Sequence, residues 1–195
     1  MTKKSIVSLV LAVSFSFQIL AQQSATYTSD LVDYQKALAL YNNQQYRAAQ
    51  SMFSSVIKTA EENILQSNCA YYIANCAVRL NQQNADQLVE NFVKEYPTST
   101  KRNTAFVNVA DYYFENSKYA YARKWYNKVD EEALGRKERE KFNFNNGYTA
   151  FSTKQYKEAK KYLSRVENSA EFGSQAKYYI GFMAYEGDDY DRANE

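Results

Sequence analysis

The chain has 195 residues, with 24 Lys and Arg, 22 Asp and Glu, and no His. Without histidine it cannot hold a Ser-His-Asp triad, a Cys-His dyad or a histidine-ligated metal. One Pro and five Gly are too few for a turn-rich β-sandwich or barrel and form no glycine-rich phosphate loop. We therefore expect an all-α protein. Its 19 Tyr and 11 Phe make aromatic residues the main clue to function.

Residues 1–21 have the layout of a secretory signal peptide, in which Lys3 and Lys4 precede an apolar run at 6–17 and a small residue, Ala21. The alternative is a membrane anchor, but this run is too short to span a bilayer comfortably. We expect cleavage after Ala21, a flexible mature N-terminus at 22–30 and no lipid or transmembrane anchor. The mature chain then carries 22 cationic and 22 acidic residues, a balance that does not favour nucleic-acid binding.

The rest of the chain repeats a Tyr-x-x-Ala pattern. Its small residue recurs at Ala49, Ala85, Ala122, Ala159 and Ala193, at steps of 36, 37, 37 and 34 residues. A second small residue precedes each copy, at Ala37, Ala74, Ala110, Gly147 and Gly181. Small residues on two antiparallel helices allow their backbones to approach closely. The pattern therefore predicts a series of helical hairpins.

The predicted hairpins follow one another along the chain. We expect helices at 31–43 with 46–60, 66–80 with 85–95, 101–115 with 119–129, 138–152 with 156–167, and 174–186 with 189 onward. The repeats then span about 31–60, 66–97, 101–130, 138–167 and 174–195. The last repeat stops one turn into its second helix, whereas solenoids normally end in a polar capping helix. The expectation is that the sequence is an N-terminal fragment of a longer protein.

This spacing resembles the tetratricopeptide repeat (TPR), with a small residue followed by Tyr nine, Ala twelve and an aromatic residue sixteen positions later, as at Ala110, Tyr119, Ala122 and Tyr126. The resemblance implies a right-handed superhelical solenoid of about five hairpins over residues 31–195. Around Pro97 the sequence is similar to exported bacterial envelope TPR proteins. This group includes the Tol–Pal-associated cell-division coordinator and the outer-membrane-assembly TPR lipoprotein, as more distant relatives. The overall composition, rich in Asn, Gln and Tyr, resembles that of exported envelope TPR proteins of Bacteroidota.

In TPR proteins the first helix of each hairpin lines a groove, at its fifth, ninth and twelfth repeat positions. The resemblance places these candidate binding residues there: Tyr71, Asn75, Asp111, Phe114, Phe144, Tyr148, Phe151, Tyr178, Phe182 and Tyr185. The alternative is that the aromatic side chains among them form intramolecular core. A carboxylate clamp would need Lys at position five and Asn at position nine, and only Asn75 matches, so we reject that mechanism.

No residue pattern predicts catalysis, and we expect no catalytic, cofactor-binding or metal-binding residues. Adjacent acids such as Glu61 and Glu62 do not share a helix face. Cys69 and Cys76 would lie about 10 Å apart along one helix, too far for a disulfide, so we expect two small buried residues. The basic segment from Lys154 to Arg165 is interpreted as a solvated face, with contact to an acidic partner or anionic lipid as the alternative.

Together these features predict a non-catalytic scaffold of the bacterial envelope. It is expected in the periplasm or at the periphery of the outer membrane, and it would bind partner proteins or peptides through its aromatic groove. One alternative is a structural spacer or a self-associating element for the missing C-terminal part. Another is a binder of peptidoglycan or other glycan.

Overall fold

The computed structural model describes residues 29–186, and the regular secondary structure in this range is entirely helical. The all-α prediction is therefore confirmed for the described residues. The helices form two compact units that divide between Ser99 and Thr100, and each unit is described by itself. The predicted signal peptide, the segment 22–28, the second helix of the fifth repeat and its Ala193 lie outside the described residues.

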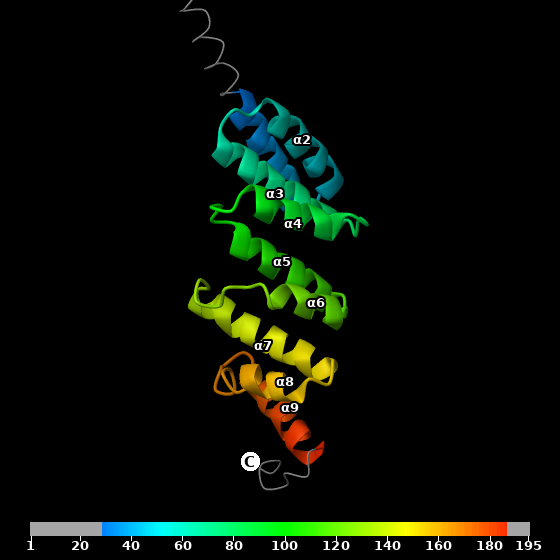
Figure 1. The fold of residues 1–195 in the computed structure, drawn as a ribbon, viewed down its shortest axis with the longest axis vertical. Coiled ribbons are helices and arrows are strands. Elements are labelled where there is room, and N and C mark those ends of the chain that lie inside the picture. Colours follow the sequence, from blue (N-terminus) through cyan, green and yellow to red (C-terminus); the bar gives the residue numbers. More distant parts are fainter. Residues whose placement is uncertain (1–28, 187–195) are drawn as a thin grey trace, which may run out of the picture. The chain divides into compact units, whose positions relative to one another are not determined.

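The first unit consists of two helical hairpins (Figure 1). A helix at 29–42 packs on α2 (Tyr46–Thr59), where the ring of Tyr34 lies 5.6 Å from that of Phe53. Helix α3 (Asn63–Arg79) pairs with α4 (Ala85–Glu95). Helix α3 also packs on α2. Tyr72 of α3 lies at this contact, with its ring centre 4.9 Å from that of Phe53, 5.0 Å from that of Tyr41 and 6.3 Å from that of Tyr34. The two hairpins therefore share one aromatic core.

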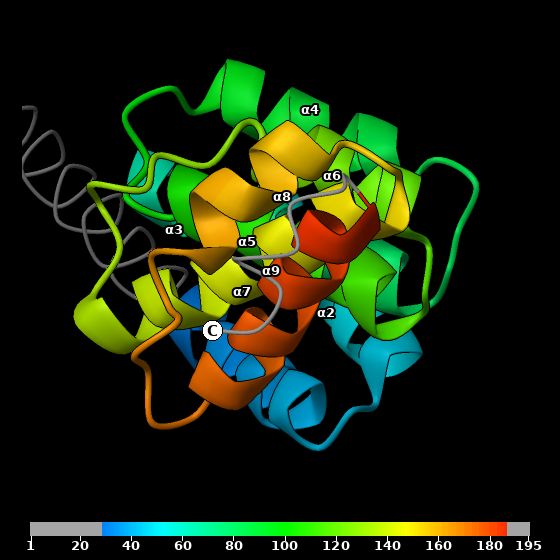
Figure 2. The ribbon, with the colours of Figure 1, turned by 90° about the horizontal axis from the view of Figure 1, so that it is seen from below.

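The second unit holds two further hairpins and a single helix. Helix α5 (Arg102–Glu115) pairs with α6 (Tyr119–Tyr126), α7 (Arg136–Ser152) pairs with α8 (Tyr156–Leu163), and α9 (Gly173–Glu186) follows. Figure 2 shows α7 in yellow, α8 in yellow-orange and α9 in orange to red. Helix α7 contacts α5, α6, α8 and α9, so it forms the centre of the unit.

The small residues of the repeat pattern lie where the two helices of each hairpin meet. On the second helices, Ala49, Ala85, Ala122 and Ala159 are at most 3% exposed. The large residue four positions later is buried in each hairpin, at Phe53, Val89, Tyr126 and Leu163. On the first helices, Ala37, Ala74, Ala110 and Gly147 are also buried. The burial of these residues agrees with the predicted register of the first four repeats.

Each hairpin turns through the same backbone geometry. In the first, the N–H of Gln44 donates to the carbonyl of Tyr41 and the N–H of Gln45 donates to that of Leu40. This pair of bonds is the Schellman motif, which places one residue in the left-handed region. The left-handed residues are Gln44 (φ 59°), Asn81 (φ 52°), Ser117 (φ 57°) and Lys154 (φ 59°). None of these four is glycine, and only Asn81 is of a type that adopts this conformation readily. At the other three positions, packing of the two helices imposes a conformation that the side chain disfavours.

Two second helices end earlier than predicted. Helix α6 stops at Tyr126 rather than 129, and α8 stops at Leu163 rather than 167. Beyond these ends the backbone forms i→i−3 bonds, from the N–H of Lys128 to Trp125 and from that of Arg165 to Tyr162. The last turn is therefore tighter than an α-helix, as is common at helix C-termini.

Candidate protein-binding surface

A ladder of aromatic rings connects the first helices of the second unit. The ring of Phe114 on α5 lies 5.7 Å from that of Tyr148 on α7, and that of Phe151 lies 5.5 Å from that of Phe182 on α9. Tyr179 bridges the same two helices, with ring centres 5.1 Å from Tyr148 and 4.8 Å from Phe151. Four of the predicted groove residues are therefore connected through rings that pack against one another.

Exposure along this ladder is uneven. Phe144 is 8% exposed because the ring of Phe172 stacks on it at 4.9 Å. Phe114, Tyr148 and Phe151 are half-buried. On α9, by contrast, exposure reaches 66% for Tyr178, 39% for Phe182 and 60% for Tyr185. These three residues are spaced by four and three positions, so they share one face of α9. We call them the α9 aromatic face.

Tyr148, at the centre of the ladder, is held as a neutral phenol. Its hydrogen bond with Tyr119 is the main cause that raises its pKa to about 12, and burial adds to the effect. The two rings lie 5.2 Å apart. A tyrosine that stays protonated at neutral pH contributes ring area and a hydrogen bond rather than charge.

Tyr71 and Asn75 are buried in the first unit. They are 5% and 2% exposed, and the Asn75 side-chain amide donates to the carbonyl of Tyr71 at 2.9 Å. The Tyr71 ring packs against Phe92 at 5.8 Å. The burial of Tyr71 matches the alternative expectation that aromatic groove residues form intramolecular core.

Asp111 joins the third hairpin to the fourth. Its carboxylate accepts hydrogen bonds from the Tyr126 hydroxyl at 2.6 Å and the Asn145 amide at 3.2 Å, and it pairs with Lys141 at 2.7 Å. Burial, followed by the negative charge of Asp111, raises the pKa of Tyr126 far above its usual range. The phenol therefore remains a donor. These contacts occupy Asp111 within the unit, at the joint between two hairpins.

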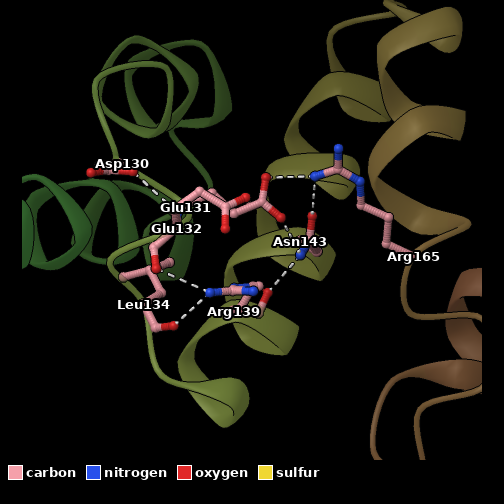
Figure 3. A network of polar contacts seen from close by, with 7 residues as sticks. All are labelled: Asp130, Glu131, Glu132, Leu134, Arg139, Asn143 and Arg165. Carbon is pink, nitrogen blue, oxygen red and sulfur yellow. Dashed lines mark hydrogen bonds and ion pairs between the residues drawn. The ribbon is translucent and has the colours of Figure 1, made fainter.

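A second polar network ties the loop after α6 to α7 and α8 (Figure 3). Arg165 donates to the Glu131 carboxylate at 2.5 Å and to the Asn143 amide oxygen at 3.3 Å. Arg139 donates to the backbone carbonyls of Glu132 at 3.1 Å and Leu134 at 3.0 Å. The side chains of Glu131 and Arg165 are 25% and 41% exposed, so their ion pair contributes about 1 kcal/mol or less.

This network borders a hollow of about 410 Å³, lined by Glu131, Arg136, Arg139, Glu140, Asn143, Arg165 and Val166. Arg165 and Glu131 contact each other across the hairpin boundary, whereas Arg136 pairs with Glu140 within α7 at 3.4 Å. The arrangement orients the loop between two repeats.

Cys69 and Cys76 are free and buried, as predicted. Burial raises the pKa of both thiols to about 12, so neither is poised as a nucleophile at neutral pH. Within residues 29–186 there is no cluster of three or more Cys, Asp or Glu side chains arranged to hold a metal ion.

The residues that connect one hairpin to the next could not be recognised from the sequence pattern. Tyr72, Asn145 and Tyr179 all occupy the sixth repeat position, one residue after a predicted groove residue. Each contacts the preceding hairpin: Tyr72 packs on Phe53, Asn145 bonds to Asp111, and Tyr179 packs on Phe151. Their types differ, so a search for identical residues does not find them. Their shared position in the repeat register is the signal.

Residues 69–99 match the tetratricopeptide repeat family model, TPR_6. This stretch of the chain is similar to a tetratricopeptide repeat. The matched stretch covers most of α3 and all of α4, and the same register of small residues and turns recurs in the other described hairpins. This agrees with the resemblance seen in the sequence.

The chain also has the fold of a solved TPR-like structure. It is similar to a point mutant of MamA, with a TM-score of 0.63 and 14% sequence identity over 84% of this chain and 86% of that chain. Similarity at this identity concerns the fold alone. No curated protein matches the sequence. Across the described residues, none of the helices combines the length and apolar composition of a membrane span.

Proposed function

We propose that this protein is a non-catalytic interaction scaffold of the bacterial cell envelope. It binds segments of partner proteins through the aromatic residues of its first helices. The observation that carries the proposal is the α9 aromatic face, where three large side chains on one helix are between 39% and 66% exposed. Tyr and Phe provide large contact areas at a low cost in side-chain entropy, which makes them frequent anchors of protein interfaces.

The half-buried rings of α7 support the same proposal because they pack against the α9 aromatic face and hold it in position. Phe182 rests on Phe151, which in turn packs against Tyr179 of α9. A partner would therefore meet aromatic side chains that are already positioned by the ladder. Preorganisation of this kind reduces the entropy that binding must overcome.

The proposed setting is the periplasm or the periphery of the outer membrane. It rests on the signal-like segment at 1–21, with Lys3 and Lys4 before its apolar run. Sequencing the N-terminus of the native protein tests this part. We expect a start at or near Gln22, and material from the cytosol that still begins at Met1 would contradict export.

Site-specific photo-cross-linking in intact cells tests the binding surface. A photoreactive phenylalanine replaces Tyr178 on the α9 aromatic face, and a matched variant carries it at Tyr121, which is 58% exposed on α6. We expect discrete adducts with envelope proteins from position 178 and few or none from position 121. Equal adducts from both positions, or none from 178, would contradict the proposal. Adducts of twice the chain mass would indicate self-association instead.

A further inference from the structure

The second helices of the second unit, together with the turns that follow them, carry the same arrangement of cations and rings twice. Lys124 directly precedes Trp125 and Lys128 follows it by three residues. The same pattern recurs 37 residues later, where Lys161 directly precedes Tyr162 and Arg165 follows it by three residues. The Lys124 and Lys128 ammonium groups lie 5.2 and 4.5 Å from the centre of the Trp125 ring. We call Lys124, Lys128, Lys161 and Arg165 the cationic stripe.

The second pair has nearly the same geometry as the first. The Lys161 ammonium lies 5.3 Å, and the Arg165 guanidinium carbon 5.5 Å, from the centre of the Tyr162 ring. A cation within about 6 Å of a ring face is attracted to it. The rings therefore restrict where these four charges can move, and a partially ordered side chain loses less entropy on binding.

The cations of the stripe are at the surface, whereas the rings lie beneath them. Trp125 is fully buried and Tyr162 is half-buried, but all four cationic residues are exposed. Both second helices pack on α7, and Phe142 of α7 contacts Tyr126 at 5.7 Å and Tyr162 at 6.0 Å. The cations beside Trp125 and those beside Tyr162 therefore belong to one packed unit.

Positive charge is concentrated in this unit. Residues 100–186 contain 16 Lys and Arg against 11 Asp and Glu, a formal charge of +5. Residues 29–99 contain 5 Lys and Arg against 7 Asp and Glu, a formal charge of −2. The near-neutral total conceals a basic second unit, which attracts acidic partners and repels basic ones.

We propose that the cationic stripe binds a segment of a partner protein rich in Asp and Glu. An extended segment is narrow enough to reach Lys124, Lys128 and Lys161 beside the acidic run Asp130–Glu131–Glu132, and it would compete with Glu131 for Arg165. A planar anionic membrane would also face these acids, and the buried rings leave no apolar side chain of the stripe to enter lipid. The stripe lies on second helices and the turns that follow them, so this inference does not rest on the proposed function of the α9 aromatic face.

Fluorescence anisotropy with a labelled oligo-glutamate peptide tests this inference on the full mature chain. We expect saturable binding that weakens as salt is added, because the contacts are between exposed charges. Replacing Lys124→Gln together with Lys161→Gln removes one cation from each half of the stripe and should weaken binding by about fivefold. The matched control is Lys94→Gln together with Lys177→Gln, which changes the net charge equally at exposed sites outside the stripe.

The control variant should change the affinity by less than about twofold. Thermal melting of both variants checks that the helices remain folded, and both should melt as the parent chain does. Absence of peptide binding, or an equal loss in the two variants, would overturn the inference. So would tighter binding of the parent chain to vesicles of phosphatidylglycerol and phosphatidylcholine than to the peptide, since that result would assign the stripe to a lipid surface.

Discussion

Gly147 and Leu163 lie so close together that a methyl group does not fit between them. A Cβ atom added to Gly147 would be 2.8 Å from Leu163 Cγ and 3.2 Å from the backbone nitrogen of Leu163. Leu163 is itself fully buried. Close approach of α7 and α8 therefore depends on the absence of a side chain at position 147.

Replacing Gly147→Ala should destabilise the second unit. Forcing an extra methyl group into a packed core typically costs about 1–3 kcal/mol, and the better helix propensity of Ala returns about 1 kcal/mol. We expect a net loss of about 1 kcal/mol, measured by urea unfolding. In a Leu163→Ala background, which removes the contact with Cγ but leaves the backbone nitrogen, the same change should cost less. If Gly147→Ala destabilises that variant as much as it destabilises the parent chain, the strain does not come from the Leu163 side chain.

Tyr126→Phe should also weaken this unit. The change removes the hydrogen bond from the buried hydroxyl to the Asp111 carboxylate, and bonds to charged groups contribute about 1.5–3 kcal/mol. Thermal melting should show a clear drop. Tyr178→Phe provides the control, because Tyr178 is 66% exposed and should melt like the parent chain. Equal melting temperatures of Tyr126→Phe and the parent would mean that the bond from Tyr126 to Asp111 does not stabilise the unit.

Two neighbouring asparagines on α7 should respond in opposite directions. Asn146 is fully buried, and neither atom of its amide group has a hydrogen-bond partner among the described residues. Asn146→Leu should therefore raise the unfolding free energy by about 1 kcal/mol, since an unpaired buried amide is costly. Asn145→Leu removes the hydrogen bond to Asp111 and should lower the unfolding free energy. If Asn146→Leu destabilises the protein by a similar amount, its amide must be satisfied in solution.

The buried thiols should make stability fall at alkaline pH. Burial raises the pKa of Cys69 and Cys76 to about 12, and the charge of Asp30 adds to the effect at Cys69. An unfolded thiol ionises near pH 8.5, so the folded state holds these protons more tightly above that value. Their contribution is complete below about pH 8.5 and is lost as the pH rises toward about 12.

Urea unfolding at about pH 8 and pH 10 measures this loss. The decrease in the unfolding free energy should be smaller in a Cys69→Ala/Cys76→Ala variant. Tyrosine ionisation affects both proteins alike, so it cancels when the two decreases are compared. The thiols of the folded parent should also react slowly with a disulfide reagent at neutral pH. Identical pH dependence in both proteins would contradict the burial of the thiols.

The hairpin register could be predicted from sequence because it depends on local spacing. Ala122 and Ala159 are small where two helices touch, and the large residue four positions later fills the space beside them. The turns were harder to predict, since Ser117 and Lys154 adopt a left-handed conformation without the usual glycine. There the packing of two helices overrides the preference of a single residue.

Exposure of the groove positions could not be predicted, because it depends on which side chain the following segment supplies. Phe144 and Tyr178 occupy the same repeat position, but the ring of Phe172 covers Phe144 and leaves it 8% exposed. Tyr178 remains 66% exposed. Asp111 illustrates the same point, since its partners Tyr126 and Lys141 come from two other helices. Such contacts follow from tertiary packing rather than from the repeat pattern.

The measurement that tests the scaffold proposal most directly compares partner recovery with stability. Tyr178→Ala together with Tyr185→Ala is set beside Tyr121→Ala, and each immobilised protein is used to co-precipitate envelope proteins while its melting is recorded. The account predicts that the α9 variant melts like the parent but recovers its partners at least about fivefold less well, since interface aromatics contribute about 1 kcal/mol or more each. Tyr121→Ala should keep both properties. A stable α9 variant that retains every partner would contradict the account.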